Sequence, residues 1–327
     1  MNKKCLLGIA GAMLLSVAFG NTASAQTPPQ GAVPSLLDNV NPRAAGMGLA
    51  ATATKDNPFG IFGNESANLF SEKRMGFGYS YNPFMPDVHK GSATHAVGGY
   101  FNIDDKNGIS FGFRDFRSFS TVIAGKEYRP NDLSVSLAYS RRIVDNFAMS
   151  LTARYVRSDY SSLSEFGFQA GNAVVFDLGF YYENTIDSFF GSTWAVGLNI
   201  NNVGTKIEIS PVSGPQTMPA FANLGGSLDM PFSENHKLLA ALDFTYVFLP
   251  STDSSFMTGF GLEYNFFKYG IVRAGYHYGD KNSIGGSYAT VGLGVKAGPV
   301  RVDGAYWIAP KDSPVKNSWT VGLSLFF

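Results

Sequence analysis

The sequence is poor in the residues that most catalytic and metal centres use. Its 327 residues contain one cysteine, Cys5, and four histidines that form no HExxH or other close pair. Only 15% of the residues are charged, and 25 Lys and Arg balance 25 Asp and Glu. These shortages argue against thiolate sites, zinc sites and cysteine catalysis, and the balanced charge argues against a nucleic-acid partner.

Motifs for nucleophilic or phosphate chemistry are also missing. The sequence has no G-x-S-x-G elbow and no Walker A loop, and its lone Gly46-Met47-Gly48 follows Asn-Pro-Arg rather than a strand pattern. Two histidines, His95 and His277, fall in predicted strands, where a structural role facing the interior is expected. We therefore expect no catalytic residue, no metal and no cofactor, so the protein is not predicted to be an enzyme.

A long apolar run occurs only near the N-terminus, and it is shorter than the ~20 residues of a membrane-spanning helix. Residues 1–25 read as a secretory signal peptide, with Lys3 and Lys4 before an apolar core and Ala23-Ser24-Ala25 as the cleavage site. Cys5 lies in this segment, so the mature chain would have no thiol. This pattern predicts export to an oxidising compartment without disulfides.

What the sequence has in abundance is glycine and aromatic residues, with 37 Gly, 28 Phe and 16 Tyr. From about residue 72 large apolar residues alternate with small or polar ones, as in Met75, Phe77, Tyr79 and Tyr81. The pattern recurs to the end of the chain and predicts an all-β fold, a closed antiparallel transmembrane β-barrel of about fourteen strands. A soluble β-sandwich adhesin would also alternate, but would carry more Lys and Glu on its outer face.

Two further features fit a membrane barrel. Aromatic residues near strand ends are placed as interfacial girdles would be, for example Tyr155, Tyr182 and Trp307. The connections alternate in length. The short set comprises residues 104–107, 144–146, 185–191, 233–236, 268–270 and 297–299. The long set comprises residues 82–91, 118–130, 158–171, 204–218, 249–254, 279–286 and 309–317. Short periplasmic turns and long outer loops are typical of bacterial barrels, and this phase places both chain ends in the periplasm.

A barrel of this size encloses a lumen that needs filling. Residues 41–70 are suited to that, because their small residues allow close packing; these are Ala44, Ala45, Gly46, Gly48, Ala50, Ala51 and Ala53. We thus expect four segments: a signal peptide over residues 1–25, a periplasmic tether over 26–40, an N-terminal plug over 41–71 and an outer-membrane barrel over 72–327.

Charged residues of both signs fall on the predicted inner faces. They are Arg154, Asp177, Glu183, Asp243, Glu263, Arg273, Arg301 and Asp303. Buried charges must be paired or hydrated. Two interpretations follow: an ion-pair network that fastens the plug to the wall, or a polar path for a substrate. Pairing depends on strand register, so the sequence leaves both open.

The last strand carries its own signal. Gly322, Leu325 and the terminal Phe327 follow a polar, glycine, apolar and aromatic pattern at alternating positions. This resembles the signal by which the barrel-assembly machinery recognises its clients. The strand would close the barrel with Leu325 and Phe327 on the lipid side.

The start of the plug, Pro42-Arg43-Ala44-Ala45-Gly46-Met47-Gly48, resembles the "S-R-A-x-G-M-G" sequence of the PorV/PorQ family of Bacteroidetes, a branch of the FadL-like outer-membrane barrels. Arg43, Gly46, Met47 and Gly48 match that motif. The family also has Asn-Pro-Ala before the first strand. Here Asn64 begins Asn64-Glu65-Ser66-Ala67 without the proline, a departure that concerns the particular member and not the barrel class.

The resemblance implies one of two roles in the outer membrane of a Gram-negative bacterium. PorV-like proteins work with the type IX secretion system, where they bind or shuttle secreted cargo proteins. FadL-like proteins transport hydrophobic small molecules that bind near the plug. A purely structural porin remains a third class. The expected partners are outer-membrane lipid, the barrel-assembly machinery, and either secreted cargo or a hydrophobic ligand.

Overall fold

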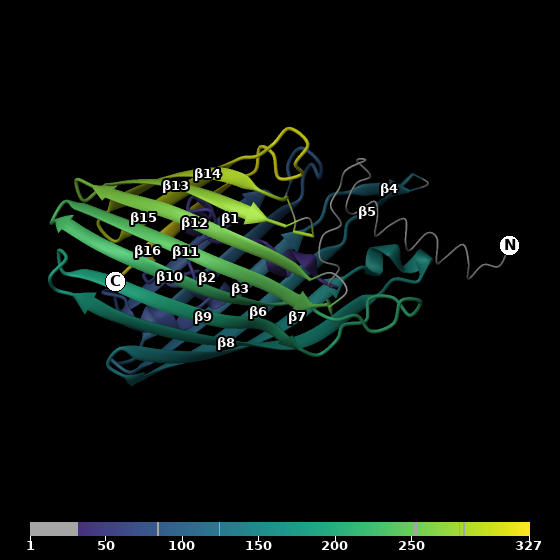
Figure 1. The fold of residues 1–327 in the computed structure, drawn as a ribbon. Coiled ribbons are helices and arrows are strands. Elements are labelled where there is room, and N and C mark those ends of the chain that lie inside the picture. Colours follow the sequence, from purple (N-terminus) through teal and green to yellow (C-terminus); the bar gives the residue numbers. More distant parts are fainter. Residues whose placement is uncertain (1–31, 84, 124, 252–253, 281, 284) are drawn as a thin grey trace.

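The computed structural model describes residues 32–327 except 84, 124, 252–253, 281 and 284. Within them, fourteen strands form one closed antiparallel barrel, which confirms the predicted fold class and excludes a soluble β-sandwich (Figure 1). The predicted signal peptide and the first part of the expected tether lie outside the described residues. No helix in the described part is long and apolar enough to cross a membrane.

Neighbouring strands follow one another around the barrel, except that β3 pairs with β6 and that β1 and β16 close the wall. β4 and β5 form a separate hairpin in the connection between β3 and β6. The strands are β1 (Met75–Pro83), β2 (Ala93–Asn102), β3 (Asn107–Arg117), β4 (Thr121–Ile123), β5 (Lys126–Tyr128), β6 (Asn131–Val144), β7 (Phe147–Asp159), β8 (Ala170–Ile186), β9 (Ser192–Gly204), β10 (Ala220–Ser233), β11 (His236–Leu249), β12 (Ser255–Phe266), β13 (Gly270–Gly279), β14 (Tyr288–Ala297), β15 (Val300–Ile308) and β16 (Trp319–Phe326). The helices are η1 (Pro34–Leu37), α2 (Pro42–Ala45), η2 (Gly60–Phe62), η3 (Glu65–Phe70) and η4 (Ser161–Phe166).

Each strand turns one face outward and one inward, as its alternation predicts. In β6, Val135 and Leu137 are exposed, whereas Ser134 and Ser136 are buried inside. Exposed apolar side chains occur on the outer face of most strands, as on the lipid-facing wall of a membrane barrel. At the closure, backbone hydrogen bonds of 3.0 Å join Met75 and Phe327 in both directions.

Two side chains face the opposite way from what the sequence predicts. Trp307 is buried in the lumen, not in a girdle, because it shares the inward parity of Arg301 and Asp303 on β15. His95 lies on the outer face, where its Nδ1 is 2.8 Å from the Tyr79 hydroxyl. Girdle and lumen assignments on one strand must obey the same period of two.

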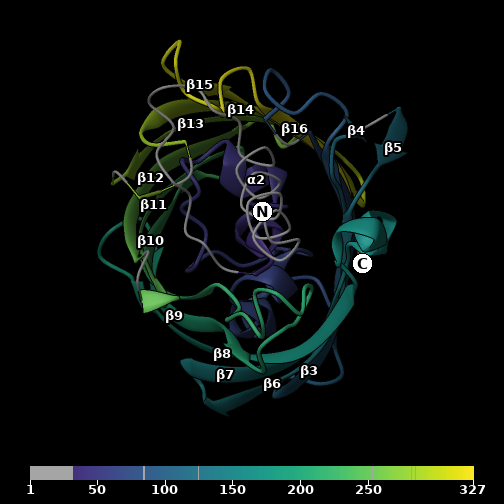
Figure 2. The ribbon, with the colours of Figure 1, turned by 90° about the vertical axis from the view of Figure 1, so that its right-hand side faces the viewer.

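The lumen holds the first described part of the chain, including η1, α2, η2 and η3 (Figure 2). α2 begins after Asn41, whose side-chain oxygen accepts a hydrogen bond from the Arg43 backbone N–H and so caps the helix. α2 contacts β14, β15 and β16, and η3 contacts β6, β7 and β8. We call residues 41–71 the plug, because they pack against opposite sides of the wall.

Long and short connections alternate as the sequence suggests, and they define two ends of the barrel. The described chain begins at the long-loop end, where Val33 and Leu36 pack against Val156, Val175 and Ile207. Phe327 lies at the opposite, short-turn end. Residues 32–40 thus pack inside the barrel, with five of the nine buried, and are not a free periplasmic tether. The apolar side chains of this segment pack against the wall instead of facing solvent. The first and last described residues therefore lie at opposite ends of the barrel, whereas the sequence predicts that both chain ends lie in the periplasm.

Candidate functional site

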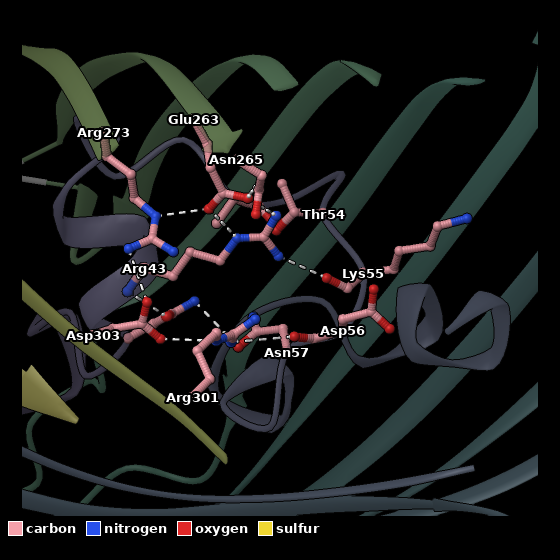
Figure 3. A network of polar contacts seen from close by, with 12 residues as sticks. Arg43, Thr54, Lys55, Asp56, Asn57, Glu263, Asn265, Arg273, Arg301 and Asp303 are labelled. Carbon is pink, nitrogen blue, oxygen red and sulfur yellow. Dashed lines mark hydrogen bonds and ion pairs between the residues drawn. The ribbon is translucent and has the colours of Figure 1, made fainter. Parts of the chain in front are cut away.

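Arg43 joins the plug to the wall through Glu263 on β12 (Figure 3). Its Nε lies 2.8 Å from Glu263 Oε2 and its Nη2 2.9 Å from Glu263 Oε1, and a third donor, Nη1, bonds the Lys55 carbonyl at 2.8 Å. The two side chains are 11% and 5% exposed. The bidentate geometry is the strongest form of an arginine–carboxylate pair, and burial limits its screening by solvent.

The network continues along the inner wall. Arg273 Nε lies 2.7 Å from Glu263 Oε2, and Arg273 Nη1 lies 2.8 Å from Asp303 Oδ1, an ion pair whose alignment falls short of a hydrogen bond. Arg301 is the last member of the network, with its Nε 2.8 Å from Asp303 Oδ2. Four of the predicted lumen charges therefore form one cluster with Arg43, built from three guanidinium groups and two carboxylates.

Glycines in the motif explain how Arg43 reaches this cluster. Gly48 has a φ of 62°, and a Cβ there would lie 2.5 Å from the Tyr276 carbonyl oxygen. On the wall, a Cβ at Gly275 would lie 2.1 Å from Gly48 N, and one at Gly261 would lie 2.4 Å from the Met47 Cβ. Gly46 approaches the Gly292 backbone in the same way. Plug and wall thus meet backbone to backbone, which only glycine permits.

The remaining lumen charges contact the plug at other places. Arg154 pairs with Asp177 at 2.7 Å and donates to the Ile61 carbonyl at 3.2 Å. Glu183 pairs with Lys55 at 3.0 Å. Asp243 Oδ2 accepts the backbone N–H groups of Ala51 and Thr52, both at 2.8 Å.

Asn64, at the position of the expected Asn-Pro-Ala motif, bridges plug and wall. Its Nδ2 donates to the Thr52 carbonyl in the plug and to the Phe180 carbonyl on β8, both at 3.0 Å. The next residue, Glu65, is buried and accepts hydrogen bonds from Ser110 and Asn68. Burial raises the pKa of Glu65 to about 8, although both hydrogen bonds oppose the shift.

A cavity of about 260 Å³ lies beside the plug, toward the long-loop end. Its apolar lining includes Leu36, Val40, Phe59, Phe62, Phe221, Tyr288, Trp307 and Trp319. Its polar lining includes Asp38, Asn41, Asn57, Asn82, Arg114, Asn223, Asp243 and His277. Among the described residues, no group of His, Cys, Asp or Glu lies close enough together to hold a metal ion.

Two cavity residues escaped the sequence reasoning. Arg114 on β3 is buried, donates to the Ser35 carbonyl at 2.9 Å and lies 4.8 Å from the centre of the Phe62 ring. Asp38 accepts a hydrogen bond from Thr94, and burial raises the pKa of Asp38 to about 7 against the opposing Arg114 charge. Arg114 could have been predicted to face the lumen, because it has the same parity in β3 as the inward-facing Ser110. No sequence pattern indicates the position of Asp38.

The three residues of the predicted assembly signal lie in the closing strand and at the chain end. Gly322 pairs with Ser80 on β1 and Leu325 with Phe77, and the Phe327 side chain is exposed. A Cβ at Gly322 would lie 2.7 Å from the Pro42 ring, so this glycine also makes room for the plug.

Solved structures of similar fold include hydrocarbon transporters and channels. The toluene transporter TbuX of Ralstonia pickettii matches with a TM-score of 0.60 at 12% identity, over 89% of this chain and 99% of that one. The monoaromatic hydrocarbon channel CymD gives 0.57 at 13%, over 88% and 98%. A Pseudomonas aeruginosa FadL homologue gives 0.56 at 13%, also over 88% and 98%. At these identities the likeness shows the fold alone.

Sequence comparison supplies the family. None of the curated proteins compared with the chain matches it. The family model described as type IX secretion system protein PorV matches residues 22–254, which is more than half of the chain. The protein is therefore a closed β-barrel that belongs to the PorV family.

Proposed function

We propose that the protein is a non-enzymatic component of type IX protein secretion that binds secreted cargo at its long-loop end. The observation that carries this proposal is the filled lumen. The plug is ion-paired to the wall at Glu263 and Glu183, and the cavity beside it measures only about 260 Å³. A polypeptide domain does not fit there, so cargo would be handled on the outer surfaces of the barrel.

The long-loop end has the features of a binding surface. The β4–β5 hairpin projects beyond the barrel in Figure 1, and Val122 on β4 is 67% exposed. In the connection between β9 and β10, Val212 is 63% exposed. We propose that this end faces the cell exterior, with residues 1–25 removed as a signal peptide during export. Exposed apolar side chains on loops are suited to contact another protein.

Affinity purification of the tagged full chain from native outer membranes tests the cargo role. The wild-type protein should recover secreted proteins, and a V122D/V212D double variant should lose them. F267D is the matched control, because Phe267 is 66% exposed but lies in a turn at the other end. Recovery of lipid without secreted protein, or equal loss in F267D, would contradict the proposal.

A second candidate is transport of hydrophobic small molecules, as the FadL-like fold suggests. The observation that favours it is the apolar part of the cavity lining beside the plug, formed by Leu36, Val40 and Phe59. Purified protein should then bind toluene or a long-chain fatty acid in equilibrium dialysis. Leu36→Asp should abolish that binding, and failure of the wild-type protein to bind either compound would remove this candidate.

A further inference from the structure

One wall of the cavity carries polar atoms that have no hydrogen-bond partner among the described residues. They are Asn223 Oδ1 on β10, Asp243 Oδ1 on β11 and His277 Nδ1 on β13. The Thr52 hydroxyl lies beside Asp243 but does not meet hydrogen-bond geometry. Asp243 is 5% exposed and His277 3%. We call these three residues the acceptor face.

Strand register brings the acceptor face together. Asp243 pairs with Gly259 on β12, and Gly259 pairs with His277, so no side chain of the wall lies between the carboxylate and the imidazole. The plug backbone at Gly48 and Ala50 packs over Gly259 between them. Asn223 pairs with Thr245, two residues along β11 from Asp243 and on the same face. Figure 2 shows β10 to β13 side by side along one side of the barrel, with the plug inside.

All three atoms can accept a hydrogen bond. The amide and carboxylate oxygens are acceptors by nature. The Gly48 backbone lies within hydrogen-bonding reach of the His277 ring. In a neutral imidazole one nitrogen carries the proton and the other accepts, so Nδ1 is an acceptor in the tautomer that is protonated at Nε2.

Asp243 also lacks a counter-ion. The other acidic residues predicted for the lumen, Asp177, Glu183, Glu263 and Asp303, each have an arginine or lysine within 3.0 Å. Asp243 has no ion-pair partner among the described residues, and its two hydrogen bonds come from neutral backbone N–H groups. A buried carboxylate in this state favours a cation that also donates hydrogen bonds.

Aromatic rings complete a cation site. Tyr288 stacks on His277 with ring centroids 4.7 Å apart, and Phe221 and Trp307 also line the cavity. Ammonium groups are attracted to the faces of such rings. Arg114, the cationic residue in the cavity lining, lies on β3, six strands around the wall from β11. It donates to the Ser35 carbonyl and lies over the Phe62 ring, while its Nε has no hydrogen-bond partner among the described residues.

We propose that the acceptor face binds the ammonium group of a small amphipathic amine, whose apolar part lies against the aromatic lining. The cavity volume lies below the range of about 300–1,000 Å³ of drug-sized sites, which sets the small size. Carboxylates are disfavoured, because Asp243 would repel them. This site is separate from the cargo-binding surface at the long-loop end and stands without it.

Calorimetric titration of the purified full chain in detergent tests the site. The probes are 2-phenylethylamine, its anionic counterpart 3-phenylpropionate and neutral ethylbenzene, at a pH where the amine is charged. The amine should bind at least about tenfold more tightly than the other two, and change the fluorescence of Trp307, the buried tryptophan of the cavity lining. Equal or tighter binding of ethylbenzene or 3-phenylpropionate, or no binding of the amine, would overturn the proposal.

Two variants separate the acceptor face from general lumen charge. D243N keeps the shape of the side chain and should weaken amine binding about tenfold or more, without weakening ethylbenzene binding. E183Q is the matched control, since it removes a lumen carboxylate that does not line the cavity, and should stay within about twofold of wild type. Folding is checked by heat-modifiable gel migration. If D243N fails to fold, N223L is tested instead, and it should likewise weaken amine binding about tenfold or more without weakening ethylbenzene binding. Unchanged amine binding in the folded variant would refute the assignment.

Discussion

Replacing Arg43 with alanine should loosen the plug while leaving the barrel wall closed. The substitution removes two hydrogen bonds to Glu263 and one to the Lys55 carbonyl, in a site where the carboxylate is 5% exposed. Removing one member of a buried ion pair costs about 3–5 kcal/mol. Arg273 still lies 2.7 Å from Glu263 and continues to compensate its charge, so the cost should fall near the lower end, at about 3 kcal/mol.

Native-state proteolysis measures this opening. A lysine-specific protease cleaves after Lys55 only when the plug opens, and about 3 kcal/mol should accelerate cleavage roughly a hundredfold. The protease does not cut at arginine, so the substitution itself changes no site. Cleavage is followed by mass spectrometry on protein refolded in phospholipid vesicles.

A matched control and a double-mutant cycle define the refuting result. E183Q removes the more exposed pair between Glu183 and Lys55, whose side chains are 18% and 24% exposed, and should cost below about 1 kcal/mol. R43A and E263Q should be non-additive, because each removes the same pair. If R43A opens the plug no more than E183Q, or if the cycle is additive, the Arg43–Glu263 pair does not hold the plug.

Three further predictions concern packing, pH and assembly. A Cβ at Gly275 would lie 2.1 Å from Gly48 N, so G275A should prevent the plug from seating and speed cleavage after Lys55. The control G226A should not, because its Cβ would meet only the Ala195 carbonyl, at 3.8 Å; equal rates would contradict the packing. Burial raises the pKa of Glu65 from 4.5 to about 8, so its stabilising contribution should be full below about pH 4.5 and disappear as the pH rises through 8. In guanidinium titrations E65Q should remove this loss, and identical pH profiles would contradict the role of Glu65. F327A keeps the backbone bonds to Met75, so the unfolding midpoint in vitro should hold while the yield of folded barrel in cells falls; a normal yield would refute the assembly role.

The barrel could be predicted because lipid enforces a strict period of two. Residues such as Val135 and Leu137 must face out and Ser134 and Ser136 in, so the pattern alone gives strand number and loop phase. The prediction that Trp307 faces outward in a girdle is wrong, because the period of two on β15 places Trp307 on the inner face with Arg301 and Asp303. The family could be predicted because the plug motif consists of residues, Gly46 and Gly48 among them, that close packing requires.

The partners of the charged residues could not be predicted, because they depend on contacts between distant parts of the sequence. Arg43 and Glu263 are 220 residues apart, and only the seating of the plug brings them together. The sequence predicts a periplasmic tether over residues 26–40, which includes Asp38. The described part of that segment lies inside the barrel because Val33 and Leu36 pack against the wall at the long-loop end. Local periodicity carries no information about such packing.

The pairing of the lumen charges bears on how the protein works. A polar path through the barrel would need charged groups free to contact a passing substrate, but four of the five predicted lumen carboxylates are bound to arginine or lysine. Displacing the plug would break the Arg43–Glu263 and Lys55–Glu183 pairs and the backbone bonds to Asp243 together. Such a loss makes displacement of the plug costly. In the proposed roles, cargo is therefore expected at the loop surface and a small ligand in the cavity beside the plug, where Asp243 is the one predicted lumen carboxylate left without a cation among the described residues.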